Sequence, residues 1–254
     1  MLNELKMQLD NGLVNYRQTS RLQGVLMEQI SAAYAQQLHE QGLKPYSQAL
    51  VHEDNKVFWI VRTLNQAAYE NIVIPMKCRE FDSFQMENDL GTIHIIGKEE
   101  RSSSLKELMN HFYTGLEDQK FINLSFQTPV SFKSGNRYLI YPELKNIYLS
   151  LMNKYSAISE SEDMMDQETL DQLVAGSELV RYNLRSTFFP LEGIRIPSFV
   201  GNIGIKIHGS HTMASYVRML CEFGEYSGVG IKTAMGMGCM KIEKRRSEND
   251  RSGN

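Results

Sequence analysis

Residues 223–240 of this chain combine glycines with a cation and a hydroxyl, a mixture that could bind a phosphate. Two Gly-x-Gly repeats, at 228–230 and 236–238, flank Lys232 and Thr233. Glycine allows positive φ and a close backbone approach to another molecule, and successive N–H groups of such a loop can form a nest for an anion. The predicted phosphate contacts are Gly228, Gly230, Lys232, Thr233, Gly236 and Gly238. Glycines that only form tight turns between packed strands are the alternative.

The flanking residues decide which kind of phosphate fits this loop. A dinucleotide fingerprint needs a strand before its glycines and a helix after them. Here a helical pattern over 213–223 comes first and a strand-like run at 240–242 follows. A Walker loop fails as well, because the chain has no Gly-Lys-Thr triplet. The pattern therefore favours a loop that holds the backbone of a polynucleotide.

This order of helix, Gly-x-Gly, basic and hydroxyl pair, Gly-x-Gly and last strand resembles the signature of the CRISPR-associated endoribonucleases that cut repeat RNA, which belong to the RAMP superfamily. Residues 38–47 are similar to another family segment, in which a Leu-His pair ends a helix and a lysine precedes a strand that opens on aromatic and serine residues. Residues 122–155 and 197–204 match the family pattern too. The resemblance implies that His39 is the general acid–base residue and that Lys44 is the lysine beside it.

These residue types suit RNA cleavage by the 2′-OH of the RNA itself. Histidine titrates near neutral pH and can transfer the protons, and a lysine can stabilise the negative charge that develops on the phosphate. The implied products are a 2′,3′-cyclic phosphate and a 5′-hydroxyl, and no metal or other cofactor is needed. The alternatives are a histidine that interacts with the dipole of its helix and an ordinary surface lysine.

One departure from the family concerns a tyrosine that some members carry two to three residues after a Gln-Gly pair. Here Gln23 and Gly24 are followed by Val25, Leu26 and Met27. The nearby phenols of Tyr34 and Tyr46 could substitute, although core packing is their favoured interpretation. The missing tyrosine bears on the cleavage rate more than on the identity of the reaction.

The elements that must position these residues follow from hydrophobic periodicity. A strand at 5–9 precedes a helix from an N-cap at Ser20 to His39, and strands at 47–51 and 57–63 form a hairpin. A short helix at 64–72 and strands at 73–80 and 93–97 complete a first ferredoxin-like unit, and 97–120 is interpreted as a linker. The second unit has a strand at 122–126, a helix at 142–155, strands at 179–189 and 194–207, the helix at 213–223 and the last strand.

Charge is unevenly distributed along the 254 residues, whose net charge is −3. Seven carboxylates lie between residues 158 and 178, which we interpret as a solvated insertion or surface helix without chemistry. The segment 181–246 is locally basic, and local patches decide contact with nucleic acid. Four cations could line a groove for phosphates, although each alone is more typical of an ordinary exposed charge: Arg181, Arg185, Arg195 and Lys206.

Other candidate sites carry less weight. His208 and His211 have the spacing of a possible metal pair, but no third ligand is evident, so we interpret them as loop and helix-start residues. The three cysteines form no Cys-x-x-Cys pair. The chain has no signal peptide and no run apolar enough to span a bilayer, so we expect a cytoplasmic protein that does not bind membranes.

The sequence therefore predicts an α+β protein with two tandem ferredoxin-like (RRM-like) domains, antiparallel sheets and helices on one face of each sheet. The expected domains are 1–118 and 119–246, with a disordered tail at 247–254. By resemblance, the chain is a metal-independent endoribonuclease that cuts CRISPR precursor RNA within repeats, as a monomer or homodimer. CRISPR repeat RNA is the expected partner, and other effector subunits are further candidates. The alternatives are a non-catalytic subunit that holds guide RNA in an effector complex and a structural or ligand-sensing protein without RNA.

Overall fold

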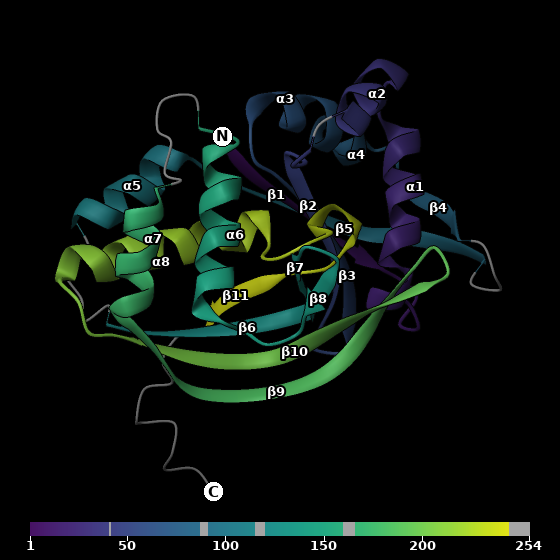
Figure 1. Ribbon diagram of the computed structural model, residues 1–254. Coiled ribbons are helices and arrows are strands. Elements are labelled where there is room, and N and C mark those ends of the chain that lie inside the picture. Colours follow the sequence, from purple (N-terminus) through teal and green to yellow (C-terminus); the bar gives the residue numbers. More distant parts are fainter. Residues whose placement is uncertain (41, 87–90, 115–119, 160–165, 244–254) are drawn as a thin grey trace, which may run out of the picture.

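Two large antiparallel sheets with their helices, and a small two-stranded sheet, make up the described part of the chain (Figure 1). The structure is a computed structural model that describes the whole chain except residues 41, 87–90, 115–119, 160–165 and 244–254. The predicted domain boundary at 118/119 and the predicted tail lie outside the described residues. No helix in the described part of the chain has both the length and the apolar character needed to cross a membrane.

The first sheet has the strand order β2-β3-β1-β5-β4. Its strands are β1 (Leu2–Leu9), β2 (Tyr46–Glu53), β3 (Lys56–Thr63), β4 (Ser83–Met86) and β5 (Gly91–Ser103). β1 lies between β3 and β5, antiparallel to both, which is the ferredoxin-like arrangement with β4 added at one edge. The predicted hairpin is confirmed, and Asp54 and Asn55 form its turn with positive φ.

The first helical segment differs from the prediction of one continuous helix. The structure has α1 (Thr19–Gln29) and α2 (Ala32–Glu40), because Ile30 adopts an extended conformation between them. Ser31 then accepts a hydrogen bond from the backbone N–H of Tyr34 at 3.2 Å and starts α2. The N-cap predicted at Ser20 is wrong, since Ser20 lies inside α1. A 3-10 helix, η1 (Tyr16–Gln18), precedes α1 and is capped by Asn15.

Residues 64–120 contain more helix than predicted. The expected short helix is present as α3 (Gln66–Ala68) and a π-helical turn η2 (Tyr69–Val73), and it continues into α4 (Ile74–Lys77) where a strand was predicted. Pro75 allows this because it falls in the first turn of α4, where a proline is tolerated. The predicted linker is also wrong: β5 continues to Ser103, and α5 (Leu105–Thr114) follows and packs on α8 (His211–Ser227).

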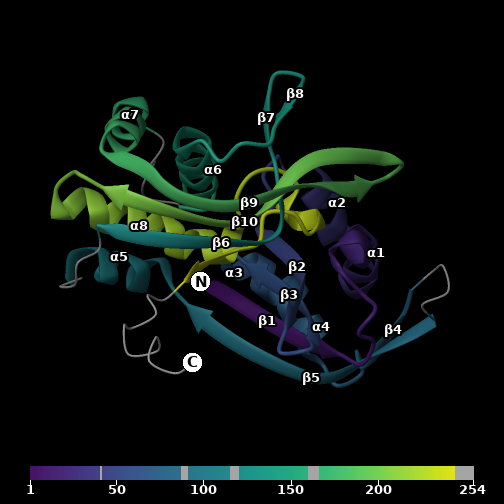
Figure 2. The same cartoon turned by 90° about the horizontal axis from the view of Figure 1, so that it is seen from below.

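The second sheet has the strand order β11-β6-β10-β9, which is the ferredoxin-like order of a βαββαβ unit. Its strands are β6 (Phe121–Val130), β9 (Ser177–Leu191), β10 (Ile194–Ile207) and β11 (Met240–Glu243). The helices α6 (Leu144–Ser156), α7 (Gln167–Ala175) and α8 (His211–Ser227) cover one face (Figure 2). A large apolar core lies between them and the sheet, and α7 is the surface helix expected in the acidic segment.

Two hairpins extend from the second unit. β7 (Phe132–Ser134) and β8 (Arg137–Leu139) form a short one. β9 and β10 form a long one that curves toward the first unit (Figure 2). The hydroxyls of Tyr16 in η1 and Thr187 in β9 lie 3.2 Å apart. The long hairpin of the second unit therefore reaches η1, just before α1 of the first unit. Residues of both units lie together at this place.

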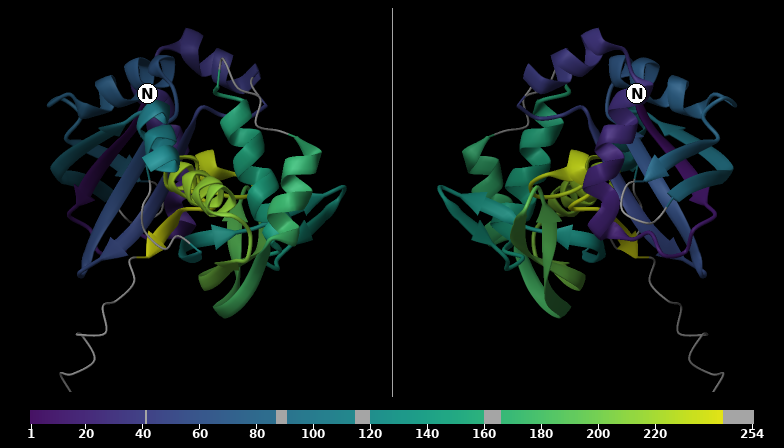
Figure 3. Two further views of the ribbon diagram at one scale, coloured as in Figure 1. Left: turned by 90° about the vertical axis from the view of Figure 1, so that its left-hand side faces the viewer. Right: turned by 90° about the vertical axis from the view of Figure 1, so that its right-hand side faces the viewer.

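The two units also meet along β2, β3 and the glycine-rich segment, which Figure 3 shows between them. Arg62 of β3 is buried there, donates to Glu4 at 2.6 Å and contacts the thiol of Cys239 at 3.4 Å. At the last residue of β2, Glu53 accepts a hydrogen bond from Lys241 of β11 at 2.8 Å. Charged groups thus join the last strand of the chain to the first sheet.

Candidate functional site

His39 lies in the last turn of α2 with an exposed side chain. The preceding residue, Leu38, is buried and holds this end of the helix against the first core. An exposed imidazole on an anchored helix end is accessible to a ligand and has a fixed backbone, as a proton-transferring group requires.

Lys44 lies beside the same helix end, because its ammonium donates a short hydrogen bond to the carbonyl oxygen of Leu38. The last carbonyls of a helix lack partners within the helix, and a lysine near them also interacts favourably with the helix dipole. His39 and the ammonium of Lys44, which are predicted to act together, therefore lie at the same end of α2. Catalysis by either residue stays a prediction.

The glycine-rich loop, residues 228–239, is packed into the middle of the molecule between α8 and β11. Gly230 has φ +78°, and a Cβ atom there would meet the Ser131 carbonyl oxygen at 2.4 Å. Gly238 has φ +75°, and its Cβ would meet the Val229 carbonyl oxygen at 2.0 Å. The glycines therefore allow the loop to fold on itself and to pack on the end of β6.

Backbone N–H groups of the loop donate mainly to the protein. Gly230 donates to the Ser150 hydroxyl at 2.8 Å and Ile231 to the Ser131 carbonyl at 3.0 Å. Val229 donates to Gly238 at 2.9 Å, and Gly238 donates to Pro129 at 2.9 Å. These four N–H groups are thus already hydrogen-bonded within the protein. Fewer N–H groups of the loop remain for the predicted phosphate nest.

Lys232 is the exposed residue of the loop, whereas Thr233 beside it is buried. Lys232 adopts the left-handed conformation with φ 57° and starts the 3-10 helix η3 (Thr233–Met235). The hydroxyl of Thr233 accepts a hydrogen bond from Lys154 of α6 at 3.3 Å. Contact of RNA with Lys232, Thr233 and the glycines stays a prediction, and exposure favours Lys232 among them.

β2 connects the helix end that carries His39 to the loop. It begins two residues after Lys44, and its Gln48 donates to the Ala234 carbonyl of the loop at 2.7 Å. Ser47 donates to the Tyr226 carbonyl at the end of α8 at 2.6 Å. In Figure 1 the start of β2 lies between α2 and the loop. β2 therefore supports both the segment that contains His39 and Lys44 and the glycine-rich loop.

Sequence reasoning missed two buried polar residues that organise this region, Gln48 and Lys154. Gln48 accepts from the Trp59 indole at 2.9 Å while it donates to the loop. Lys154 is 7 % exposed, and burial lowers the pKa of its ammonium to about 7. A polar side chain inside an otherwise apolar pattern, a strand for Gln48 and a helix for Lys154, was the only available signal, since the loop that both residues contact is remote in sequence.

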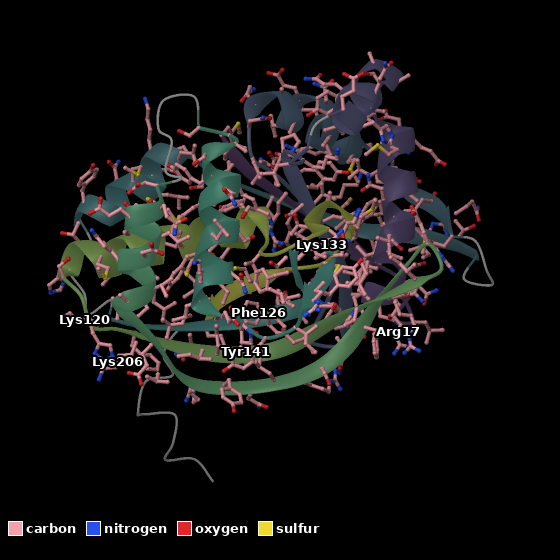
Figure 4. All side chains as sticks on the ribbon, viewed as in Figure 1. Arg17, Lys120, Phe126, Lys133, Tyr141 and Lys206 are labelled. Atoms are coloured by element: carbon pink, nitrogen blue, oxygen red, sulfur yellow. The ribbon has the colours of Figure 1, made fainter. Side chains whose placement is uncertain are left out.

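The four cations considered for a phosphate groove do not line one groove. Arg195 lines a cleft of about 620 Å³ together with Arg17 and Arg21 of the first unit, and Met235 of the loop borders it. Arg181 lines a separate hollow, where it donates to Asn123 at 3.0 Å. Figure 4 shows Arg17 at one end of the second sheet and Lys206, with Lys120, at the other.

His208 lies in the loop between β10 and α8, and His211 is the first residue of α8, which confirms their predicted places. The Nε2 atom of His208 lies 2.9 Å from a carboxylate oxygen of Glu178 at the start of β9, so the ring pairs with that side chain. Within the described residues, no three histidine, cysteine or acidic side chains are grouped as metal ligands.

Comparison with known proteins identifies similar chains. Residues 124–240 match the model of the family described as CRISPR-associated endoribonuclease Cas6. A protein of that name from Streptococcus thermophilus is 33 % identical over 226 residues, which cover 89 % of this chain and 91 % of the relative. One from Mycobacterium tuberculosis is 33 % identical over 223 residues, or 87 % of this chain and 70 % of the relative.

Solved structures share the fold at lower identity. A product complex of Thermus thermophilus Cas6 superposes with a TM-score of 0.77 at 18 % identity and covers 96 % of this chain and 100 % of that chain. At this identity the likeness concerns the fold, and it confirms the predicted pair of ferredoxin-like units.

Proposed function

The chain belongs to the Cas6 family of CRISPR-associated endoribonucleases, and from this premise we propose that it cuts CRISPR precursor RNA within the repeats and releases guide RNAs. Solved neighbours of the same fold include a product complex and a substrate-mimic complex of Cas6 proteins, which supports RNA as the ligand here. The finer proposal is that the reaction is a metal-independent transesterification.

One observation carries the assignment of the reactive residues: the exposed His39 and the ammonium of Lys44 lie at the same end of α2. An imidazole and a cation at one accessible place are the two groups that such a reaction requires. Leu38, whose side chain is buried and whose carbonyl oxygen accepts from Lys44, fixes both relative to the fold.

The proposed steps use only groups of the RNA and of this chain. The ribose 2′-oxygen forms a bond to the adjacent phosphorus and loses its proton, while the bond from phosphorus to the 5′-oxygen breaks and that oxygen gains a proton. His39 transfers these protons, and Lys44 stabilises the negative charge on the phosphorane. The upstream product then ends in a 2′,3′-cyclic phosphate and the downstream product begins with a 5′-hydroxyl.

The glycine-rich loop is proposed to hold the RNA backbone at its exposed residue, Lys232. The ammonium of a surface lysine neutralises a phosphate as a point charge, and each such contact makes binding depend on salt. The loop contacts β2 through Gln48, and β2 begins just after the Lys44 segment. RNA bound at Lys232 would therefore lie on a loop that contacts β2, the strand that begins next to His39 and Lys44.

A substrate with one 2′-deoxy nucleotide at the cut tests the proposed function. We expect the protein to cut its cognate repeat RNA in EDTA and to leave the deoxy substrate intact, because the attacking hydroxyl is then missing. Binding of both RNAs with cutting of neither would favour the non-catalytic guide-RNA subunit. Cutting of the deoxy substrate would exclude attack by the 2′-OH.

A further inference from the structure

Lys154 makes an unusual set of contacts with the glycine-rich loop. Its ammonium donates to the carbonyl oxygens of Ser227 at 3.3 Å and Gly228 at 3.0 Å, and to the hydroxyl of Thr233 at 3.3 Å. These oxygens lie at the two ends of the segment 227–233, which includes the exposed Lys232. One buried side chain thus ties both ends of the segment together.

Among the described residues, the three oxygens to which the Lys154 ammonium donates are all neutral. Desolvation is the cause that lowers the pKa of its ammonium to about 7. Two carboxylates on the adjacent α8 have other partners: Glu225 accepts from the N–H of Ile242 at 2.9 Å, and Glu222 lies 3.9 Å from Arg218. A buried ammonium held only by neutral oxygens is unfavourable for stability, and such groups are more often found where they serve function.

Lys232, at the other side of Thr233, has a backbone conformation that side chains rarely adopt. Four non-glycine residues among those described have positive φ: Asp54, Asn55, Glu192 and Lys232. The first three lie in the turns of the β2–β3 and β9–β10 hairpins, where such conformations are ordinary. Lys232 lies outside any hairpin turn, and a strained residue of this kind persists only when its surroundings enforce it.

We propose that Lys154 is a positioning residue of the RNA site: it holds segment 227–233 in the conformation that presents Lys232 to a phosphate of the RNA. The inference rests on the proposed function and adds a residue to it. Lys154 is buried beneath the segment and acts through Lys232.

A double-mutant cycle on RNA affinity tests this coupling. The probe is the cognate repeat RNA with a 2′-deoxy at the cut, and the variants are Lys154→Met, Lys232→Met and the double variant. We expect each single variant to weaken binding by about tenfold, and the double variant to bind no more weakly than either single one, because both changes remove the same contact. Lys145→Met, an exposed lysine of the same helix, is the matched control and should bind as the wild type does.

Binding by Lys154→Met at wild-type strength would overturn the proposal, as would single effects that multiply in the double variant. If the wild type itself does not bind the RNA, the proposed function fails first. Should Lys154→Met not fold, Thr233→Val removes one accepting oxygen with little change in shape. It should weaken binding in the wild-type background and have no further effect in Lys232→Met, and additive effects there would count against the proposal.

Thermal unfolding against pH, measured together with RNA affinity, distinguishes a positioning role from a merely structural one. Because the pKa of Lys154 is about 7 when folded and about 10.5 as a free side chain, the unfolded chain binds more protons between these values. The stability of the wild type should therefore rise with pH over this window, and Lys154→Met should lack that rise. A Lys154→Met variant that is less stable at every pH, yet binds RNA normally, would show that the residue only supports the core.

Discussion

Replacing His39 by alanine should lower the rate of RNA cleavage by about 10²–10⁴-fold, the usual contribution of general acid–base catalysis. The side chain is exposed at the end of α2, so its removal leaves no cavity and should change stability by no more than about 0.5 kcal/mol. RNA affinity should remain close to that of the wild type, because the proposed RNA contacts lie in the loop. Single-turnover cleavage and equilibrium binding of the same repeat RNA measure the two effects separately.

Gln37→Ala is the matched control, since Gln37 is an exposed neighbour on the same helix. It should cut at the wild-type rate. A His39→Ala variant that also cuts at that rate would show that another residue transfers the protons. A variant that loses binding and cleavage to the same extent would show that His39 contacts the RNA in the ground state instead.

Gly238→Ala should be among the most damaging single substitutions in the chain. The new Cβ would lie 2.0 Å from the Val229 carbonyl oxygen, and the residue would keep a φ of +75°. Strain at such a φ and overpacking each cost about 1–3 kcal/mol, so the free energy of unfolding should fall by roughly 2–6 kcal/mol. Chemical denaturation measures this loss, and RNA affinity should fall with it because the loop cannot keep its conformation.

Gly24→Ala provides the opposite control. Gly24 lies inside α1 with no atom within 4 Å of the added Cβ, so alanine should stabilise the helix by up to about 1 kcal/mol. If Gly238→Ala were as stable as the wild type and bound RNA equally well, the tight fold of the loop would not matter to the site.

Local patterns predicted most elements of the fold. The alternation of Ile122, Leu124 and Phe126 gave β6, and the helical spacing from Leu144 to Tyr155 gave α6, because each pattern reflects burial of one face. The failures occurred where local signals competed. Ser31 was overlooked as the start of α2 inside a continuous apolar pattern, and the apolar run 72–76 continued a helix where a strand was expected.

The candidate site was predictable only in part. His39 and Lys44 were found as one segment because they are close in sequence, and the glycines were found by their spacing. The contacts that Lys154 and Gln48 make with segment 227–234 could not be found in this way, because they join residues 73 to 186 positions apart. For the same reason, only the fold shows that N–H groups of the loop are hydrogen-bonded within the protein. It also shows that Lys232 is the exposed residue of the loop.

The chemical ends of the cleavage products test most directly the claim that this chain cuts RNA through the RNA's own hydroxyl. Mass spectrometry of the products made from cognate repeat RNA in EDTA should find a 2′,3′-cyclic phosphate on the upstream fragment and a 5′-hydroxyl on the downstream one. A 3′-hydroxyl paired with a 5′-phosphate would contradict the account, because water would then have been the nucleophile.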